Sequence, residues 1–377
     1  MKILLVANYL PDTKESMDHF ARMLKDGLVA LNHDVRVVRP ESIFGSLKPS
    51  DIGLGKWLGY IDKFFFFPPR LCKAVGWADV VHILDHSNAV YARYLKRIPH
   101  IVTCCDLLAI RSAFGEFKEN MVGWTGRQFQ KRILRGINTA RKIACISEAT
   151  VKNLLRISNL KPKDILLIYM GLNYPYSPME REGAINHLKS LGIDTEKPFL
   201  LHLGKNQWYK NRIGLLRIFK ELVQLQGVSD IHLVCAGKDP LTKVMRRYLK
   251  DNNIEHKVFE IVSPQDEELR ALYSLAVALL YPSLYEGFGW PIIEAQACGC
   301  PVFTSNRPPM TEAGGEAAVY FDPTDPQAAA SMIAATLKDK QKLLQLRQAG
   351  FLNVKRFSAQ EMVNNYVRIY QEILQNN

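Results

Sequence analysis

Two glutamates bracket a glycine-containing turn in the last third of the chain. They stand eight positions apart in the run Glu286-Gly-Phe-Gly-Trp-Pro-Ile-Ile-Glu294. The apolar residues Val277–Tyr281 predict a buried strand before this run, and Pro291 suits the first turn of a helix, where a missing N–H costs nothing. The glycines then lie in a strand-to-helix turn, where backbone N–H groups can approach an anion. Two acceptors flanking an anion site suit a nucleotide sugar, which has a phosphate in its middle and hydroxyls at both ends.

A glutamate pair by itself also fits ordinary exposed carboxylates on a loop and a helix. The longer segment 281–305, from Tyr-Pro-Ser-Leu-Tyr-Glu to Pro-Val-Phe-Thr-Ser, closely resembles the donor-site signature of family 4 glycosyltransferases. The resemblance implies a retaining enzyme with the α/β GT-B fold. In that fold, two doubly wound Rossmann-like domains face each other across a cleft and the last helix crosses back to the first domain. It also implies a nucleotide-diphosphate sugar as the donor substrate.

A second chemical motif is the basic run Gly204-Lys205-Asn-Gln-Trp-Tyr-Lys210, which follows the apolar strand predicted at Phe199–Leu203. Cations placed there can neutralise the charge that builds on a departing diphosphate. Lys205 and Lys210 match the two cationic positions of the family's phosphate-binding loop. Many relatives have arginine at the first of these positions. Lys205 supplies a single ammonium charge there instead of a guanidinium that can bind phosphate through two N–H groups. Solvated lysines on a loop are the competing interpretation.

The resemblance also assigns roles on the donor side. Glu286 would hold hydroxyls of the transferred sugar, and Glu294 would accept hydrogen bonds from the nucleotide ribose. Val262 follows a predicted strand and would line the base pocket through its backbone, so the base itself is not identified. The remaining donor-binding residues are expected to be Gly204, Gly287, Phe288 and Gly289.

The acceptor side departs from the family pattern. The loop 8–17 has no glycine, although relatives commonly carry a glycine pair there, and Ser16 either contacts the acceptor or caps the following helix. Cys105 stands where the family has histidine, and no nearby base makes it a nucleophile. Asp106 would take the acceptor proton or orient the acceptor. Capping of the next turn is the competing interpretation. Arg111 would pair with Asp106 or with an anionic acceptor.

The sequence gives no pattern typical of a metal site. No Asp-x-Asp follows a predicted strand, and His82 and His86 lie on a strand and its exit, where a polar edge is the better interpretation. In the family, lysines and helix dipoles take the place of Mg²⁺. We therefore expect neither a metal nor another cofactor.

Alternating strand and helix patterns predict two doubly wound parallel sheets. A polar, proline-containing stretch at 174–197 separates them, so we expect an acceptor-binding domain at 1–178 plus 358–377 and a donor-binding domain at 179–357. A helix at 17–31 and a last helix that begins after Ser358 carry apolar stripes. The predicted strands are Ile3–Ala7, Val35–Val38, Val80–Leu84, Ile101–Cys104, Lys142–Ile146, Ile165–Tyr169, Phe199–Leu203, Ile231–Ala236, Val258–Ile261, Val277–Tyr281 and Val302–Thr304.

Charge is concentrated in the first half. Residues 1–180 hold 26 Lys and Arg against 16 Asp and Glu, which leaves +10 of the net +12. This suits an anionic substrate or anionic lipid, and no RNA-binding motif or zinc-finger spacing points to nucleic acid. The segment 56–70 places Phe64 to Phe67 beside cations, which is typical of a lipid interface. Packing of these rings in the core explains the same pattern.

Seven dispersed cysteines and the absence of a signal-peptide pattern favour a reducing cytoplasm. No stretch approaches the roughly 20 apolar residues of a membrane span, so we expect a cytoplasmic protein that contacts the inner face of a membrane. The expected function is transfer of a hexose to a sugar or lipid-linked acceptor in polysaccharide or glycolipid synthesis. A GT-B-fold epimerase or phosphorylase and a non-catalytic nucleotide-sugar-binding protein are the alternatives.

Overall fold

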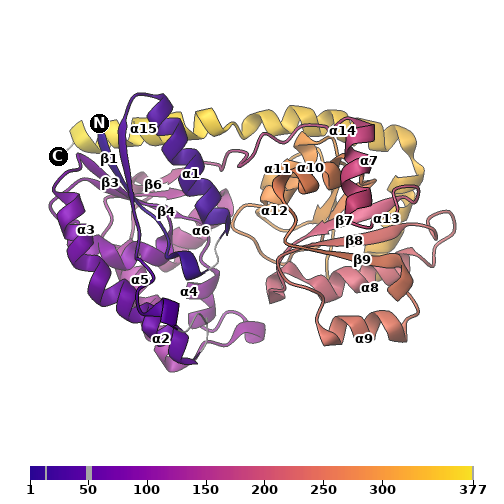
Figure 1. Ribbon diagram of the computed structural model, residues 1–377, viewed down its shortest axis with the longest axis horizontal. Helices are drawn as coiled ribbons and strands as arrows, with labels where there is room; N and C mark the ends of the chain where they lie inside the picture. Colours follow the sequence, from indigo (N-terminus) through magenta and orange to yellow (C-terminus); the bar gives the residue numbers. More distant parts are fainter. Residues whose placement is uncertain (13–14, 48–52, 376–377) are drawn as a thin grey trace. The chain divides into compact units, whose positions relative to one another are not determined.

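A computed structural model describes residues 1–12, 15–47 and 53–375 of the chain. It divides into two compact units, residues 1–173 with 359–377, and residues 174–358. Each unit has one six-stranded sheet in which every paired strand is parallel, with helices packed around it (Figure 1). The prediction of two doubly wound parallel sheets is confirmed.

The first unit has the strand order β2-β1-β3-β4-β5-β6. Its central strands are buried along their whole length because helices cover both faces, which explains their continuous apolar sequences. The strands are β1 Lys2–Val6, β2 Asp34–Val38, β3 Val80–Ile83, β4 His100–Cys104, β5 Lys142–Cys145 and β6 Ile165–Leu167. The α-helices are α1 Glu15–Ala30, α2 Gly53–Ile61, α3 Phe67–Val75, α4 Leu108–Ala113, α5 Trp124–Ile137, α6 Glu148–Ile157 and α15 Ala359–Gln375.

The last helix of the chain, α15, belongs to the first unit, as predicted. Tyr366 of α15 contacts the Phe20 ring of α1, with 6.0 Å between ring centroids. His82 of β3 is fully buried beneath α15, where its Nδ1 lies 2.7 Å from the Tyr370 hydroxyl and its Nε2 lies 2.7 Å from Thr103 Oγ1. Burial lowers the pKa of His82 to about 3, so the ring is neutral in the folded protein. Its place between these partners makes it a structural core histidine and not a metal ligand.

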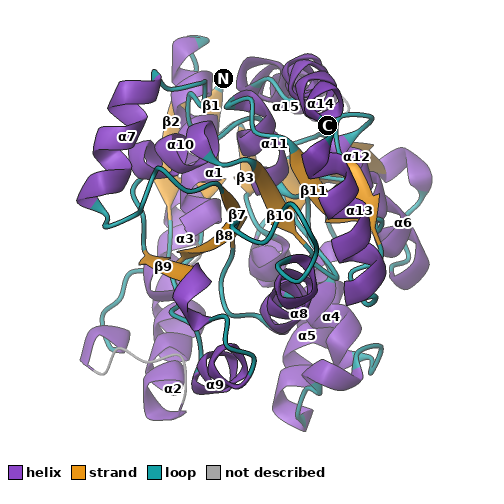
Figure 2. Cartoon of the chain, turned by 90° about the vertical axis from the view of Figure 1, so that its right-hand side faces the viewer, coloured by secondary structure: helices purple, strands orange, loops and turns teal. Residues whose placement is uncertain are grey.

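The second unit has the strand order β12-β11-β10-β7-β8-β9. Helices α8, α9 and α13 pack on one face of this sheet, and α10 and α11 lie on the other (Figure 2). The strands are β7 Phe199–Leu203, β8 His232–Gly237, β9 Val258–Val262, β10 Ala278–Tyr281, β11 Val302–Ser305 and β12 Val319–Phe321. The α-helices are α7 Arg181–Ser190, α8 Arg212–Leu222, α9 Lys243–Asp251, α10 Asp266–Leu275, α11 Trp290–Ala297, α12 Met310–Gly314, α13 Pro326–Lys338 and α14 Lys340–Asn353.

The four consecutive phenylalanines do not share one environment. Phe64, Phe65 and Phe66 belong to a π-helical turn, Asp62–Phe66, whereas Phe67 begins α3. Phe67 is buried, and Phe64 contacts Tyr60 and the Phe129 ring of α5. Phe65 and Phe66 are 74% and 43% exposed. The core interpretation therefore holds for the outer two rings, and the two middle rings are available at the surface.

Within the described part of the chain, none of the helices combines the length and the apolar character that crossing a bilayer requires.

Candidate active site

The turn between β10 and α11 has the conformation that its sequence predicts. Gly289 directly precedes α11 and has a φ of +108°, which side-chain-bearing residues rarely adopt. A Cβ atom at this position would also lie 3.2 Å from Ile292 Cδ1. Glu286 lies in the turn and Glu294 lies one helical turn inside α11. The glycine thus lets the chain enter the helix with its first N–H groups directed at the turn.

The structure brings Glu286 and Lys210 together from two different strand ends. Lys210 Nζ lies 2.7 Å from Glu286 Oε1 and 2.9 Å from Oε2, so it contacts both carboxylate oxygens. Only 15% of the Lys210 side chain and 9% of the Glu286 side chain are exposed. Two residues assigned to the phosphate and the sugar are therefore neighbours, and most of each side chain is shielded from solvent.

Tyr281, the last residue of β10, completes this group. Its hydroxyl donates to Glu286 Oε1 at 2.6 Å and accepts from Lys210 Nζ at 2.7 Å. Burial, followed by the charge of Glu286, raises the pKa of Tyr281 well above its usual value, so it stays a neutral donor. The sequence did not single out Tyr281, because it closes an apolar strand and looks like a core residue.

Glu294 is 4% exposed, and Tyr273 of α10 donates to its Oε2 at 2.9 Å. Burial raises the pKa of Tyr273 well above its usual value, and the neighbouring carboxylate adds to the shift. The Tyr176 ring meets the Tyr273 ring edge-on. Glu294 is thus an oriented carboxylate in the core and not an exposed helix residue, which contradicts the simpler interpretation of the glutamate pair.

The ends of β7, β8 and β9 meet at a close backbone contact. Gly204, after β7, donates its N–H to the Ala236 carbonyl at 3.0 Å. Gly237, at the end of β8, has a φ of +150°, and a Cβ atom there would lie 2.3 Å from the Gly204 carbonyl oxygen. Val262 ends β9 beside them and is 52% exposed. Gly237 is a further site residue that the sequence did not reveal, since its role depends on a contact with another loop.

Lys205 is half-buried in the loop after β7. The next residue, Asn206, donates its backbone N–H to Asp239 at 2.7 Å, which ties this loop to the one that follows β8. All donor-side residues named from the sequence therefore lie in or beyond the carboxyl ends of β7, β9 and β10, except Glu294 inside α11. Carboxyl strand ends are the usual ligand-binding edge of such sheets.

The acceptor-side residues lie in the first unit and are less clearly organised. Asp106 accepts the Leu108 N–H at 2.9 Å, as expected for the capping interpretation. Arg111 contacts Glu116, with 2.8 Å between Nε and Oε2. Cys105 is buried, and its Sγ lies 3.4 Å from the Met17 sulfur.

Ser16 is exposed within the first turn of α1, which begins at Glu15, and not before the helix, as capping requires. The glycine-free loop that precedes α1 includes residues 13 and 14, which lie outside the described residues.

Comparison with known proteins places these sites in a family context. A sequence model described as Glycosyl transferases group 1 matches residues 185–352, and one described as Glycosyltransferase Family 4 matches residues 17–174. The chain is 26% identical over 250 residues to O-antigen chain mannosyltransferase B of Escherichia coli, a match that covers 65% of this chain and 64% of the relative. It is 24% identical over 292 residues to D-inositol 3-phosphate glycosyltransferase of Corynebacterium diphtheriae, covering 74% and 67%.

Solved structures show the same fold at low identity. Sucrose-phosphate synthase from Thermosynechococcus elongatus aligns with a TM-score of 0.75 and 19% identity, and the alignment covers 100% of both chains. Anabaena Alr3699/HepE in complex with UDP and glucose aligns with a TM-score of 0.76 and 14% identity, covering 98% of this chain and 99% of that one. The GT-B fold that the resemblance predicts is confirmed.

Proposed function

Because the chain belongs to the family 4 glycosyltransferases, we propose that it transfers a hexose from a nucleotide-diphosphate sugar to a sugar or lipid-linked acceptor, with retention of anomeric configuration. The observation that carries this proposal is the contact between Lys210 and Glu286 beside the start of α11, with Glu294 one turn further on. The O-antigen mannosyltransferase among the relatives favours a role in polysaccharide synthesis.

Each group at this site has a task in the transfer. Glu286 accepts hydrogen bonds from sugar hydroxyls, and its carboxylate is held for that purpose by Tyr281. The N–H groups of Gly287, Phe288 and Gly289 surround sugar and phosphate, and Glu294 binds the ribose. Lys205 and Lys210 stabilise the negative charge that develops on the departing diphosphate, the interaction that accelerates this step.

Retention follows from attack on the face that the diphosphate leaves. A diphosphate oxygen accepts the acceptor proton, so the transfer does not depend on a histidine at position 105. Asp106, already bonded to the Leu108 N–H, orients the acceptor. The positive charge that a divalent ion supplies in other transferases comes from the two lysines, so we propose that the reaction needs no metal. Undiminished turnover in excess EDTA is the expected result.

Release of nucleoside diphosphate from a panel of nucleotide sugars tests the function. We expect release that depends on an added saccharide or lipid-linked acceptor. Release driven by inorganic phosphate would indicate a phosphorylase, and conversion of the donor without release would indicate an epimerase. Thermal stabilisation by a donor without turnover on a broad acceptor panel would indicate a binding protein.

We further propose that the first unit contacts anionic membranes through an aromatic-basic face. This face consists of exposed Trp57, Phe65 and Phe66 together with the cations on the exposed side of α5. The two parts adjoin, because Phe129 of α5 contacts Tyr60 of α2. The α5 cations are Arg127, Lys131, Arg132 and Arg135. Positive charge beside exposed rings matches an anionic bilayer surface and not a neutral one.

Vesicle flotation tests the membrane contact. We expect binding to vesicles that contain phosphatidylglycerol, little binding to phosphatidylcholine alone, and a clear loss in a Phe65→Ser, Phe66→Ser double variant. Leu352→Ser is the matched control, because Leu352 is 66% exposed in the second unit. Equal binding to both vesicle types would contradict the proposal.

A further inference from the structure

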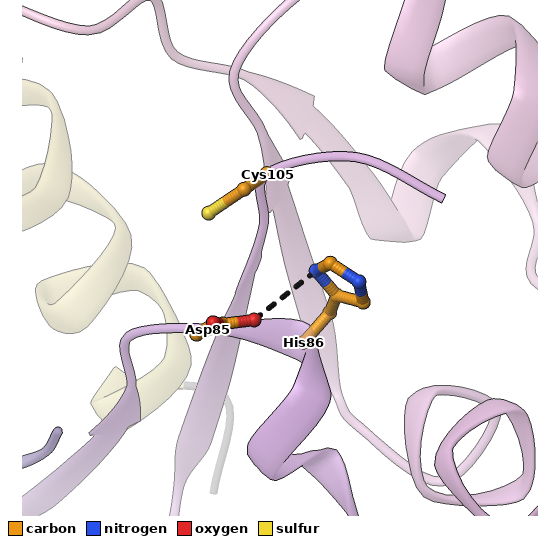
Figure 3. Close-up of side chains that lie close together, drawn as sticks. All are labelled: Asp85, His86 and Cys105. Carbon is orange, nitrogen blue, oxygen red and sulfur yellow. Dashed lines mark ion pairs between the residues drawn. The ribbon is translucent and has the colours of Figure 1, made fainter. Parts of the chain in front are cut away.

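Three potential metal ligands meet at the carboxyl edge of the sheet in the first unit. Asp85 and His86 follow β3, and Cys105 follows the neighbouring strand β4. One donor atom from each lies within 4.8 Å of the other two, and all three residues are buried. In Figure 3 the Asp85 carboxylate and the His86 ring turn toward each other, with Cys105 across from them.

One nitrogen of the His86 ring is paired with the Asp85 carboxylate but makes no hydrogen bond to any described residue (Figure 3). This nitrogen, Nδ1, is buried and, among the described residues, has no hydrogen-bond partner. It lies 3.3 Å from Asp85 Oδ1, but the two groups do not align as donor and acceptor. Buried polar atoms are normally hydrogen-bonded, so an orphan that faces a carboxylate needs a cause. A cation bound by Nδ1 would give this nitrogen the partner that it lacks.

The Asp85 carboxylate is fixed in place by its neighbours. Asn8, after β1, donates its side-chain amide to Asp85 Oδ2 at 2.6 Å, and the Ser87 N–H donates to Oδ1 at 2.8 Å. Outer hydrogen bonds of this kind orient the ligands of metal sites and strengthen them.

We propose that Asp85, His86 and Cys105 bind a thiophilic divalent cation of the Zn²⁺ class. Thiolate, imidazole and carboxylate together suit zinc, whereas Mg²⁺ and Ca²⁺ prefer oxygen ligands alone. Three atoms that are mutually within 4.8 Å share a central point no more than about 2.8 Å from each (4.8 Å divided by √3). Zinc–ligand distances are about 2.0 to 2.3 Å, so small side-chain rotations would bring the three ligand atoms to coordination distance.

Binding converts the Cys105 thiol to a thiolate, and one proton leaves to solvent for each ion bound. The thiolate and the carboxylate then neutralise the dication in a buried place. Three protein ligands leave a fourth position open for water. The site is separate from the lysines and glutamates of the second unit, so the proposed donor chemistry does not depend on it.

Titration of the metal-depleted full-length protein with Co²⁺ tests the site. We expect one equivalent to bind tightly and to give a thiolate-to-cobalt charge-transfer band with visible d–d bands of a tetrahedral centre. One equivalent of Zn²⁺ should displace it. No charge-transfer band in the folded wild-type protein would overturn the proposal.

Variants identify the ligands. Cys105→Ser should abolish the charge-transfer band. His86→Gln, which keeps the thiol, should weaken Co²⁺ affinity by roughly 100-fold, since even the loss of outer partners weakens metal sites about 10- to 100-fold. The control is Cys72→Ser, because Cys72 is an exposed free thiol. Loss of the band in the control, or its survival in folded Cys105→Ser, would show that the thiolate ligand lies elsewhere and refute the assignment.

Discussion

Replacement of Lys210 by methionine tests the central contact of the candidate active site. The variant keeps an unbranched side chain one atom shorter than lysine and removes its charge. The Glu286 carboxylate, 9% exposed, is then left with Tyr281 as its remaining donor in this group. Removing one partner of a fully buried pair costs about 3 to 5 kcal/mol. Because this pair retains some solvent contact, we expect a loss of about 2 to 3 kcal/mol.

The size of the unit converts this free energy into a melting shift. For a unit of 150 to 250 residues, 1 kcal/mol corresponds to about 2 to 4 °C. The second unit, residues 174–358, falls in this range. Calorimetry of the full-length protein should therefore show the transition of the second unit about 4 to 12 °C lower in Lys210→Met.

A double-mutant cycle separates the interaction free energy of Lys210 and Glu286 from the other effects of each substitution on stability. Lys210→Met combined with Glu286→Gln should lose less stability than the two single variants together, because no unpaired buried charge remains. Lys152→Met is the matched control, since its partner Glu148 is 3.8 Å away and both side chains are more than half exposed. The control should change stability by less than about 0.5 kcal/mol. Additive single effects, or a control shift as large as that of Lys210→Met, would refute the reasoning.

Three further predictions address the donor loops and the core. Gly237→Ala should displace the Gly204 carbonyl, which lies 2.3 Å from the added Cβ, and weaken donor binding measured by calorimetry, whereas Gly183→Ala, with open space around it, should not. Glu294→Ala should raise the donor Kd by about tenfold or more through lost ribose contacts, and an unchanged Kd would place the ribose elsewhere. Burial lowers the pKa of His82 to about 3 from 6.5, so the unfolded chain binds a proton that the native protein does not. Stability should therefore fall as the pH drops from about 6.5 toward 3, by about 2 kcal/mol at pH 5 relative to pH 7, and urea unfolding of His82→Gln should lack this contribution.

Much of the fold could be predicted because helices on both faces force the central strands to be apolar throughout. All eleven strands expected from such runs are present, with ends that differ by at most two residues. The strand that was missed, β12 Val319–Phe321, has three residues and is only partly buried, so it leaves no pattern. The prediction of a family 4 glycosyltransferase is confirmed, whereas the roles of individual site residues remain predictions.

The parts of the site that escaped prediction depend on contacts between distant segments. Tyr281 ends an apolar strand and Tyr273 lies on the buried face of the amphipathic helix α10. Their role shows only through the carboxylates to which their hydroxyls donate. Gly237 is required because the Gly204 carbonyl of another loop lies where a Cβ atom would be. Asp85 and Cys105 approach each other because β3 and β4 are adjacent in the sheet, which spacing along the chain does not reveal.

The position of α15 has a consequence for biosynthesis. The first 173 residues leave the ribosome without the helix that covers the surface around Phe20 and His82, and 185 residues of the second unit are translated before it follows. At a translation rate of about 5 to 20 residues per second, this apolar surface stays exposed for roughly 10 to 40 s before α15 can pack on it. Nascent chains of this protein should therefore depend on chaperones during that interval, and a stop codon that removes the final helix should produce an aggregating polypeptide even though every residue of the donor-side loops is intact.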